Sequence, residues 1–222
     1  MLIRLATLAA AALLLATPAL TQQPNGHEGT DGMCIPAAAR AGREYGCFVI
    51  ATMPLGKLPT TGLYWHIDRY PSRAAAQKDR GVRSTILQSY GSIWMFSIAD
   101  ENFLAAHGER VAKVGPLPLG AEKSYTAWYM EATFKPGMVS AVHRHTGPEA
   151  WYVLSGEQCL ETPSGKTVIG ARQSGLVPGG PPMMLLATSA AERRSLVLIL
   201  GDSSLPASLP VNDWTPKGLC KS

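Results

Sequence analysis

The chain has 222 residues, of which 16% are charged, and its 20 basic and 16 acidic side chains give a formal net charge of +4. This length is sufficient for one domain with a well-formed core. Lysine and arginine do not cluster anywhere along the sequence. We therefore expect no nucleic-acid partner, because the electrostatic footprint of such a protein is missing.

The first twenty residues have the pattern of a secretory signal peptide. A short start with one positive charge precedes a Leu/Ala run, and small residues around Ala16 and Ala19 offer a cleavage site. The run is shorter than the roughly 20 apolar residues that span a bilayer. We predict a signal peptide over 1–20, a disordered lead-in over 21–33, and an exported protein, periplasmic or extracellular, without membrane contact after cleavage.

Residues 34–118 are predicted to form extra strands and one short helix. The runs "CFVIATMPLG" and "GLYWHIDRY" are rich in β-branched and aromatic residues, and two further strands flank Gly91 in "STILQSYGSIWMFSIAD". Between them, "PSRAAAQKDRG" predicts a helix that is capped by Ser72 and ends before Gly81. The Pro/Gly-rich "VGPLPLG" then marks the boundary with the second part of the chain.

Residues 119–222 are expected to be entirely β-structure. Strands are predicted at "SYTAWYMEATF", "MVSAVHRH", "EAWYVLSG", "EQCLET", "KTVIG", within 174–188 and at "SLVLILG", with a tight turn at "KPG". Many short strands separated by Gly and Pro indicate a closed or nearly closed barrel or jelly roll.

Four cysteines remain after the predicted cleavage: Cys34, Cys47, Cys159 and Cys220. An even number in an oxidising compartment predicts two disulfides, with three connectivities open. We favour Cys34–Cys47, which closes a short N-terminal loop, and Cys159–Cys220, which ties the C-terminal tail to the barrel.

The segment "GMVSAVHRHTGPEAWYVLSG" contains the candidate metal ligands. His143 and His145 share parity on a predicted strand, so both side chains leave the same face, whereas Arg144 leaves the other. A three-residue turn then brings Glu149 to the start of the neighbouring strand. Two histidines and a carboxylate are the donor set of open non-haem sites for iron or manganese, and zinc also accepts it.

The spacing of this segment resembles the first sequence motif of the cupin superfamily, with Gly137, His143, His145, Glu149 and Gly156 at matching positions. The second motif is incomplete. Its Pro and Gly residues are present at 178–180, but Met183 stands at the position of the fourth ligand, a histidine in cupins. The resemblance covers about residues 124–201.

The resemblance implies an all-β-dominated fold, a cupin-type double-stranded β-barrel (jelly roll) that here carries an N-terminal extension. It implies one divalent transition metal (Fe, Mn, Zn, Ni or Cu) held by His143, His145 and Glu149. A Met183 thioether would be a soft, weak ligand that suits copper(I) better than iron(II), and we favour Met183 as an apolar wall that leaves coordination positions open. We favour an enzyme that acts on a small organic molecule as an oxygenase; isomerase or lyase chemistry stays open. The alternatives are a non-catalytic ligand-binding cupin, or an interaction protein with a vestigial metal site.

Other residues are candidates for lining the pocket. Trp151 shares parity with Glu149, and Gln158 follows Gly156 on the next strand. Tyr129 and Glu131 lie on the strand before the motif, where ordinary barrel packing is the preferred interpretation. The aromatic strands around "YWHID" and "IWMF" are candidates for a homodimer contact, and His66 within them is expected to be a packed core residue.

Overall fold

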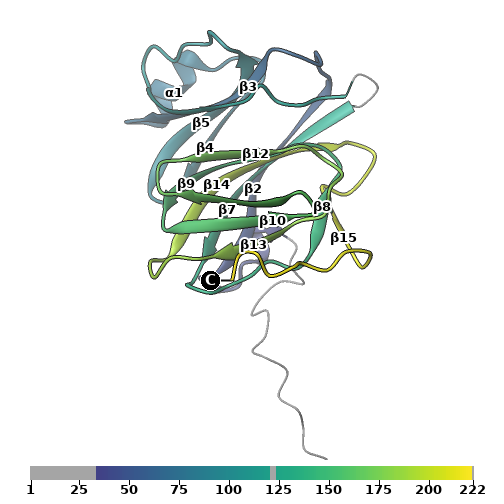
Figure 1. Cartoon of the computed structure of the whole chain (residues 1–222). Coiled ribbons are helices and arrows are strands. Elements are labelled where there is room, and N and C mark those ends of the chain that lie inside the picture. The colour runs from purple at the N-terminus through teal and green to yellow at the C-terminus, as the bar shows by residue number, and fades with distance from the viewer. Residues whose placement is uncertain (1–33, 121–123, 222) are drawn as a thin grey trace, which may run out of the picture.

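The computed structural model describes residues 34–120 and 124–221, which form three stacked layers of β-sheet (Figure 1). The predicted signal peptide and lead-in lie outside the described residues. Among the described residues, no helix is long and apolar enough to cross a bilayer. A six-stranded central sheet separates an N-terminal sheet, drawn at the top of Figure 1, from two smaller sheets below it.

The central sheet has the order β1-β2-β7-β14-β9-β12. Its strands are β1 (Ile35–Pro36), β2 (Gly46–Lys57), β7 (Ser124–Phe134), β9 (Glu149–Ser155), β12 (Ser174–Val177) and β14 (Arg193–Asp202), and the short 3-10 helix η1 (Ala37–Ala39) follows β1. It faces the sheet β11-β10-β13 and the pair β15-β8. These comprise β8 (His143–His145), β10 (Glu157–Thr162), β11 (Gly165–Gly170), β13 (Met184–Ala187) and β15 (Ser208–Pro210).

The alternation of residues along β7 explains why the central sheet is covered on both faces. Met130, Ala132 and Phe134 point into the barrel, where they join Trp151 and Leu160 in one apolar core. The intervening side chains point to the opposite face, which a second apolar core covers. A strand that is covered on both faces is apolar along most of its length, and "SYTAWYMEATF" is buried at every position from Tyr129 to Phe134.

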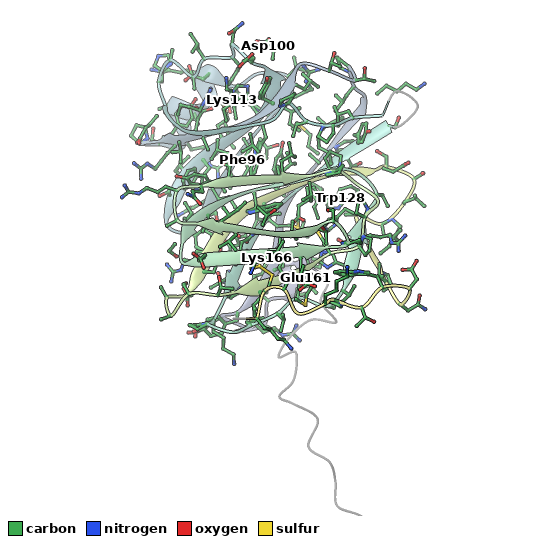
Figure 2. All side chains as sticks on the ribbon, in the orientation of Figure 1. Phe96, Asp100, Lys113, Trp128, Glu161 and Lys166 are labelled. Carbon is green, nitrogen blue, oxygen red and sulfur yellow. A yellow bond between two sulfur atoms is a disulfide. The ribbon has the colours of Figure 1, made fainter. Side chains whose placement is uncertain are left out.

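The second core lies between the central sheet and the N-terminal sheet, whose order is β4-β5-β3-β6. This layer contains β3 (Leu63–Tyr70), α1 (Arg73–Asp79), β4 (Ser84–Ser89), β5 (Ser92–Asp100) and β6 (Glu109–Val114). Phe96 of β5 packs edge-on to Trp65 and contacts Tyr129 of the barrel, with ring centroids 5.3 Å apart in both pairs. In Figure 2 Phe96 lies between the two layers.

Most predicted elements of the N-terminal part are confirmed, including the helix and its cap. The Ser72 side chain accepts a hydrogen bond from the Ala75 backbone N–H at 3.1 Å, and β4 and β5 are separated at Gly91. The strands β1, β6 and β15 were not predicted. Its boundary at 118 also differs from the sheets, because β1 and β2 belong to the central sheet of the barrel and only residues 58–118 make the outer layer.

The aromatic strands of the outer layer are not free to dock a partner through their apolar face. Trp65, Trp94 and Phe96 are buried in the core of the same chain. The opposite face of β3 and β5 packs against α1, where Tyr70, Ala76 and Met95 form a third small cluster. The homodimer remains a prediction, but these side chains are already used within one chain.

Both predicted disulfides are present, Cys34–Cys47 and Cys159–Cys220. The second one holds the C-terminal tail against β10. There the buried carboxylate of Glu161 also accepts hydrogen bonds from the backbone N–H groups of Lys217 and Leu219. The tail is therefore fixed by a covalent bond and two hydrogen bonds to the same strand.

Candidate metal centre

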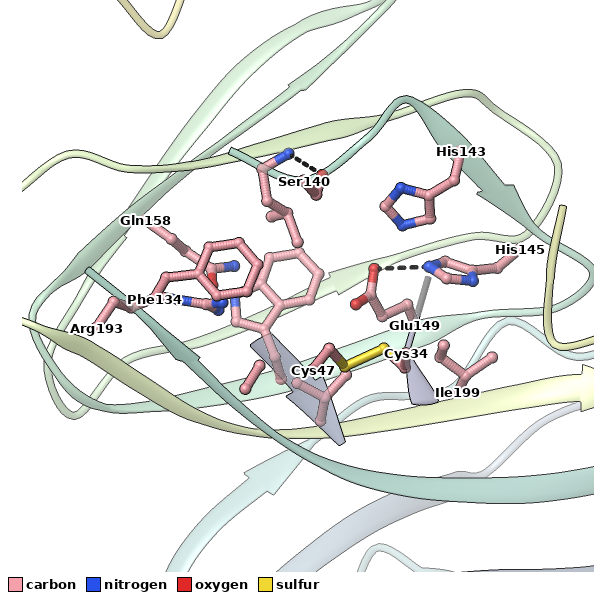
Figure 3. Close-up of a pocket in the computed structure, with 14 residues that line it drawn as sticks. Cys34, Cys47, Phe134, Ser140, His143, His145, Glu149, Gln158, Arg193 and Ile199 are labelled. Carbon is pink, nitrogen blue, oxygen red and sulfur yellow. Dashed lines mark hydrogen bonds and ion pairs between the residues drawn. A yellow bond between two sulfur atoms is a disulfide. The ribbon is translucent and has the colours of Figure 1, made fainter. Parts of the chain in front are cut away.

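A small cavity of about 30 Å³ lies inside the barrel between the central sheet and the smaller sheets. The Cys34–Cys47 disulfide, aliphatic side chains, Phe134 and Trp151 form most of its wall. Its polar lining residues are Ser140, His143, His145, Glu149, Gln158 and Arg193 (Figure 3). In this view the two histidines and Glu149 lie at one end and Arg193 at the other.

The strand β8, which carries both histidines, is only three residues long and is held on both sides. On one side it pairs with β15, with Ser208 opposite His145. On the other, His143 and Met183 exchange backbone hydrogen bonds of 3.1 and 2.8 Å. The sequence predicted a longer strand from Met138, but residues between the KPG turn and β8 make only the isolated bridge at Val139. The parity prediction is confirmed: His143 and His145 are both buried and line the cavity.

Backbone carbonyls orient both imidazole rings. The Nδ1 atom of His143 lies 2.8 Å from the Ala141 carbonyl oxygen, and that of His145 lies 3.1 Å from the Ala207 carbonyl oxygen. A carbonyl oxygen only accepts, so Nδ1 of His143 donates and Nε2 is the ring atom left for a metal. Nδ1 of His145 also lies 3.0 Å from the Ser208 hydroxyl oxygen, and when this Nδ1 donates to the Ala207 carbonyl, Nε2 is left for a metal in the same way. This is the arrangement typical of metal-binding histidines, in which the second ring nitrogen donates to a carbonyl or carboxylate.

Glu149 begins β9 and completes the donor set. Its Oε2 lies 3.3 Å from Nε2 of His145, and neither atom has a conventional hydrogen-bond partner among the described residues. Burial alone raises the pKa of Glu149, but the nearby His145, together with His143 and Arg193, holds it below its usual value, so the group is a carboxylate. A lone pair facing a carboxylate is unfavourable unless a proton or a metal cation lies between them.

The separation of these two atoms fits a shared metal. Ligand atoms that each bind a metal at about 2.1 Å lie roughly 3.0–3.4 Å apart in octahedral or tetrahedral geometry. The 3.3 Å between His145 and Glu149 falls in this interval. His143 is less well placed: within the described residues no three His, Cys, Asp or Glu side chains are arranged to hold a metal as they stand. Ligation by all three residues therefore requires a side-chain rearrangement.

For the remaining predicted pocket residues, the face of the strand that each occupies decides whether it reaches the cavity. Trp151 and Gln158 line the cavity as expected. Met183 is fully buried in the same interior core but does not line the cavity. The prediction for Tyr129 and Glu131 is wrong, because odd-numbered residues of β7 point away from the barrel interior.

Tyr129 and Glu131 both lie on the side of the central sheet that is turned away from the barrel interior. Tyr129 packs in the core beneath the outer sheet. The Glu131 carboxylate pairs with Arg40 and accepts a hydrogen bond of 2.7 Å from Ser89. Tyr152 of β9 also points away from the barrel interior and is buried in that same core.

Arg193 is a cavity residue that the sequence analysis missed. It is only 1% exposed and stands on β14 with its guanidinium stacked on Phe134, 4.2 Å from the ring centroid. Burial lowers its pKa to about 10, so it stays charged at neutral pH. The alternation of residues in "RRSLVLILG" could have predicted this orientation. Arg193 lies on the same face of the strand as Val197 and Ile199, which point into the barrel.

The sheets and the placement of the motif define a cupin-type double-stranded β-barrel with a histidine pair and a carboxylate inside it. No protein-family model and no curated protein matches the sequence. Among solved structures, the chain is similar to an oxalate oxidase bound to the substrate analogue glycolate, with 18% identity over 38% of this chain and a TM-score of 0.34. The match spans 46% of the oxalate oxidase chain, less than half of its length.

Two further similar structures come from bacteria. One is a cupin superfamily protein from Desulfitobacterium hafniense, which is 14% identical in sequence with a TM-score of 0.32. The match covers 39% of this chain and 74% of the other chain. The other is an uncharacterized conserved protein with a double-stranded β-helix domain from Klebsiella pneumoniae. It is 15% identical in sequence with a TM-score of 0.35, and the match covers 44% of this chain and 78% of the other chain. Likenesses at this level indicate nothing about substrate or reaction.

Proposed function

We propose that the chain is an exported metal-binding protein that holds one divalent transition metal through His143, His145 and Glu149 and acts on a very small molecule in the barrel. The observation that supports this best is that backbone carbonyls lie beside both Nδ1 atoms, while Nε2 of His145 lies 3.3 Å from the buried Glu149 carboxylate. Three protein ligands leave coordination positions open for a substrate or dioxygen.

The residues of the chain have separable roles in this proposal. The Ala141 and Ala207 carbonyls fix the ring orientation, and Glu149 contributes the negative charge that offsets part of the charge of a cation. Trp151 and Phe134 form part of the apolar wall of the cavity. When bound, the metal would supply Lewis-acid or redox chemistry, and an oxygenase is the use that we favour.

The cavity volume limits the substrate. A water molecule needs roughly 10–15 Å³ of such volume, so about 30 Å³ admits a ligand of only a few heavy atoms. Export is supported by the predicted signal peptide and by the two disulfides, which persist in oxidising compartments.

Metal content tests the proposal. The protein is purified without a metal-affinity tag, and bound metals are identified and counted by mass spectrometry, followed by affinity titration. We expect about one metal per chain, and an affinity lowered by at least about 100-fold in His143→Ala, His145→Ala and Glu149→Ala, beyond what loss of an outer hydrogen-bond partner costs. His107→Ala is the matched control, because His107 is half-exposed and pairs with Asp79 outside the cavity. Equal metal in the parent and all three cavity variants contradicts the proposal.

A non-catalytic ligand-binding role is the second candidate, favoured by the apolar wall of Ala132, Leu185, Val197 and Ile199. The two functions differ in oxygen uptake and in the effect of a chelator. A binding protein shows a ligand-induced thermal shift that survives chelation and consumes no oxygen. The oxygenase loses its activity when the metal is removed.

A further inference from the structure

Arg193 has two hydrogen-bond donors that no described residue satisfies. Its Nη1 donates to Gln158 Oε1 and, at 2.8 Å, to Ser195 Oγ. Its Nε and Nη2 are buried and have no partner among the described residues. A buried charged donor without a partner is costly, so this pair of N–H groups needs an acceptor.

The identity of the two unsatisfied atoms indicates the shape of that acceptor. In a guanidinium group, Nε–H and one N–H of Nη2 point in parallel along the same edge, and this edge binds the two oxygens of a carboxylate. The remaining contacts of Arg193 hold this edge in place. Phe134 covers the flat face of the group, while Gln158 and Ser195 occupy the other edge.

The charges in the cavity also call for an anion once the proposed metal is bound, a step that rests on the proposed function. Arg193 supplies one positive charge to the cavity lining and Glu149 one negative charge. A divalent cation would add two positive charges to this largely apolar space. Buried uncompensated charge is strongly unfavourable, so an anionic ligand is expected to accompany the metal.

We propose that the Nε/Nη2 edge of Arg193 is the binding site of a small carboxylate in the barrel cavity, so that the substrate or ligand class of this protein is a carboxylate of a few heavy atoms. Formate and acetate are the probes that match the cavity. Arg193 then positions the ligand through its carboxylate, at the end of the cavity opposite the histidines (Figure 3). The competing interpretation is that Arg193 only packs on Phe134.

The experiment is a formate and acetate titration of the full mature protein, first metal-free and then metal-loaded, followed by NMR of the arginine Nε–H groups. The Arg193 resonance is assigned by its loss in Arg193→Lys. We expect this resonance to shift saturably with formate but not with formamide, which is neutral and similar in size. A charge-assisted pair of hydrogen bonds corresponds to a weakening of formate binding by about 10- to 100-fold in Arg193→Gln. Arg193→Lys, which keeps the charge and loses the paired geometry, should lie between the two.

Arg194→Gln is the matched control, because Arg194 is the next residue of β14 and is half-exposed in a pair with Glu192. It should bind formate as the parent does. An Arg193 resonance that does not move with formate, or equal formate affinity in the parent and a folded Arg193→Gln variant, overturns the inference; the resonance decides if that variant does not fold. Formate binding through Arg193 in a protein that takes up no metal contradicts only the proposed function. Metal binding with no carboxylate effect contradicts only this inference.

Discussion

Burial and neighbouring groups together shift the pKa values of individual side chains in the cavity. Burial, and then the neighbouring His145, lowers the pKa of His143 below its usual value of 6.5. Glu149 is likewise held below its usual value by the histidines and Arg193, which together outweigh its own burial. Neutral imidazole and charged carboxylate are the forms that bind a metal. The Glu149 carboxylate is thus available to a metal at neutral pH, while ligation by all three residues requires a side-chain rearrangement.

The same pKa shift makes the folded protein sensitive to acid. In the unfolded chain His143 binds a proton near pH 6.5, whereas in the folded protein it does so only at lower pH. Since the unfolded state binds more protons in this interval, the free energy of unfolding is fully retained above pH 6.5 and falls as the pH drops through the folded pKa. We expect a loss of up to about 1.4 kcal/mol per pH unit from this group, measured by denaturant unfolding of metal-free protein between pH 7.5 and 5.5.

His143→Gln is the comparison for this effect, because it removes the titrating group and keeps a polar side chain. The pH dependence should become shallower without vanishing, since burial also lowers the pKa of His66. An unchanged pH dependence in the variant would show that His143 does not carry the effect.

At the scale of elements, the turn between β8 and β9 sets the distance between the candidate ligands. A Cβ atom on Gly147 would lie 1.8 Å from the Leu200 carbonyl oxygen, and one on Gly179 would lie 2.5 Å from the Gly147 Cα. The backbones of the turn, β14 and the loop after β12 are therefore in direct contact. The Leu200 N–H also donates to the Pro148 carbonyl at 2.9 Å, which fixes the turn immediately before Glu149.

Gly147→Ala tests the importance of this close contact. The added methyl group cannot fit without displacing backbone, so we expect a loss of about 1–3 kcal/mol of unfolding free energy, typical of overpacking, together with weaker metal binding. Denaturant unfolding and metal titration measure the two effects. Gly170→Ala is the control, because its Cβ would meet only the Gln173 side chain at 3.8 Å. Metal affinity that stays unchanged in Gly147→Ala would show that the turn does not position Glu149.

The elements also show which features the sequence could predict. The local sequence was sufficient to predict α1, because its Ser72 cap is visible in the sequence. It was also sufficient to predict that the two histidines of β8 point to the same side of the strand. The strand β15 has only three residues and exists because β8 supplies its partner, so no pattern of its own marks it. Tyr129 and Glu131 were placed on the wrong face because β7 is apolar on both sides, and parity then does not say which side is the barrel interior. Arg193 was missed because an arginine at the start of an apolar strand normally lies at the surface.

For the molecule as a whole, the central sheet is shared by two apolar cores. Its barrel face carries Glu149 of β9, and its other face holds Tyr129, Tyr152 and Leu198 beneath the outer sheet. Phe96 joins these layers through its contacts with Trp65 and Tyr129. Elements that share a continuous core are expected to unfold together, so residues 58–118 should not behave as an independent domain.

Phe96→Ala tests this coupling far from the candidate metal site. Truncation of a fully buried phenylalanine typically costs about 3–5 kcal/mol, and here the loss should appear in the unfolding of the whole protein. We expect far-UV circular dichroism and tryptophan fluorescence to report one coincident transition in the parent and in Phe96→Ala, shifted to lower denaturant in the variant. Val168→Ala, at a site 48% exposed on β11, should change the free energy of unfolding by less than about 0.5 kcal/mol. If Phe96→Ala instead splits the transition in two, with circular dichroism and fluorescence diverging, the outer sheet folds on its own and the shared core does not couple the layers.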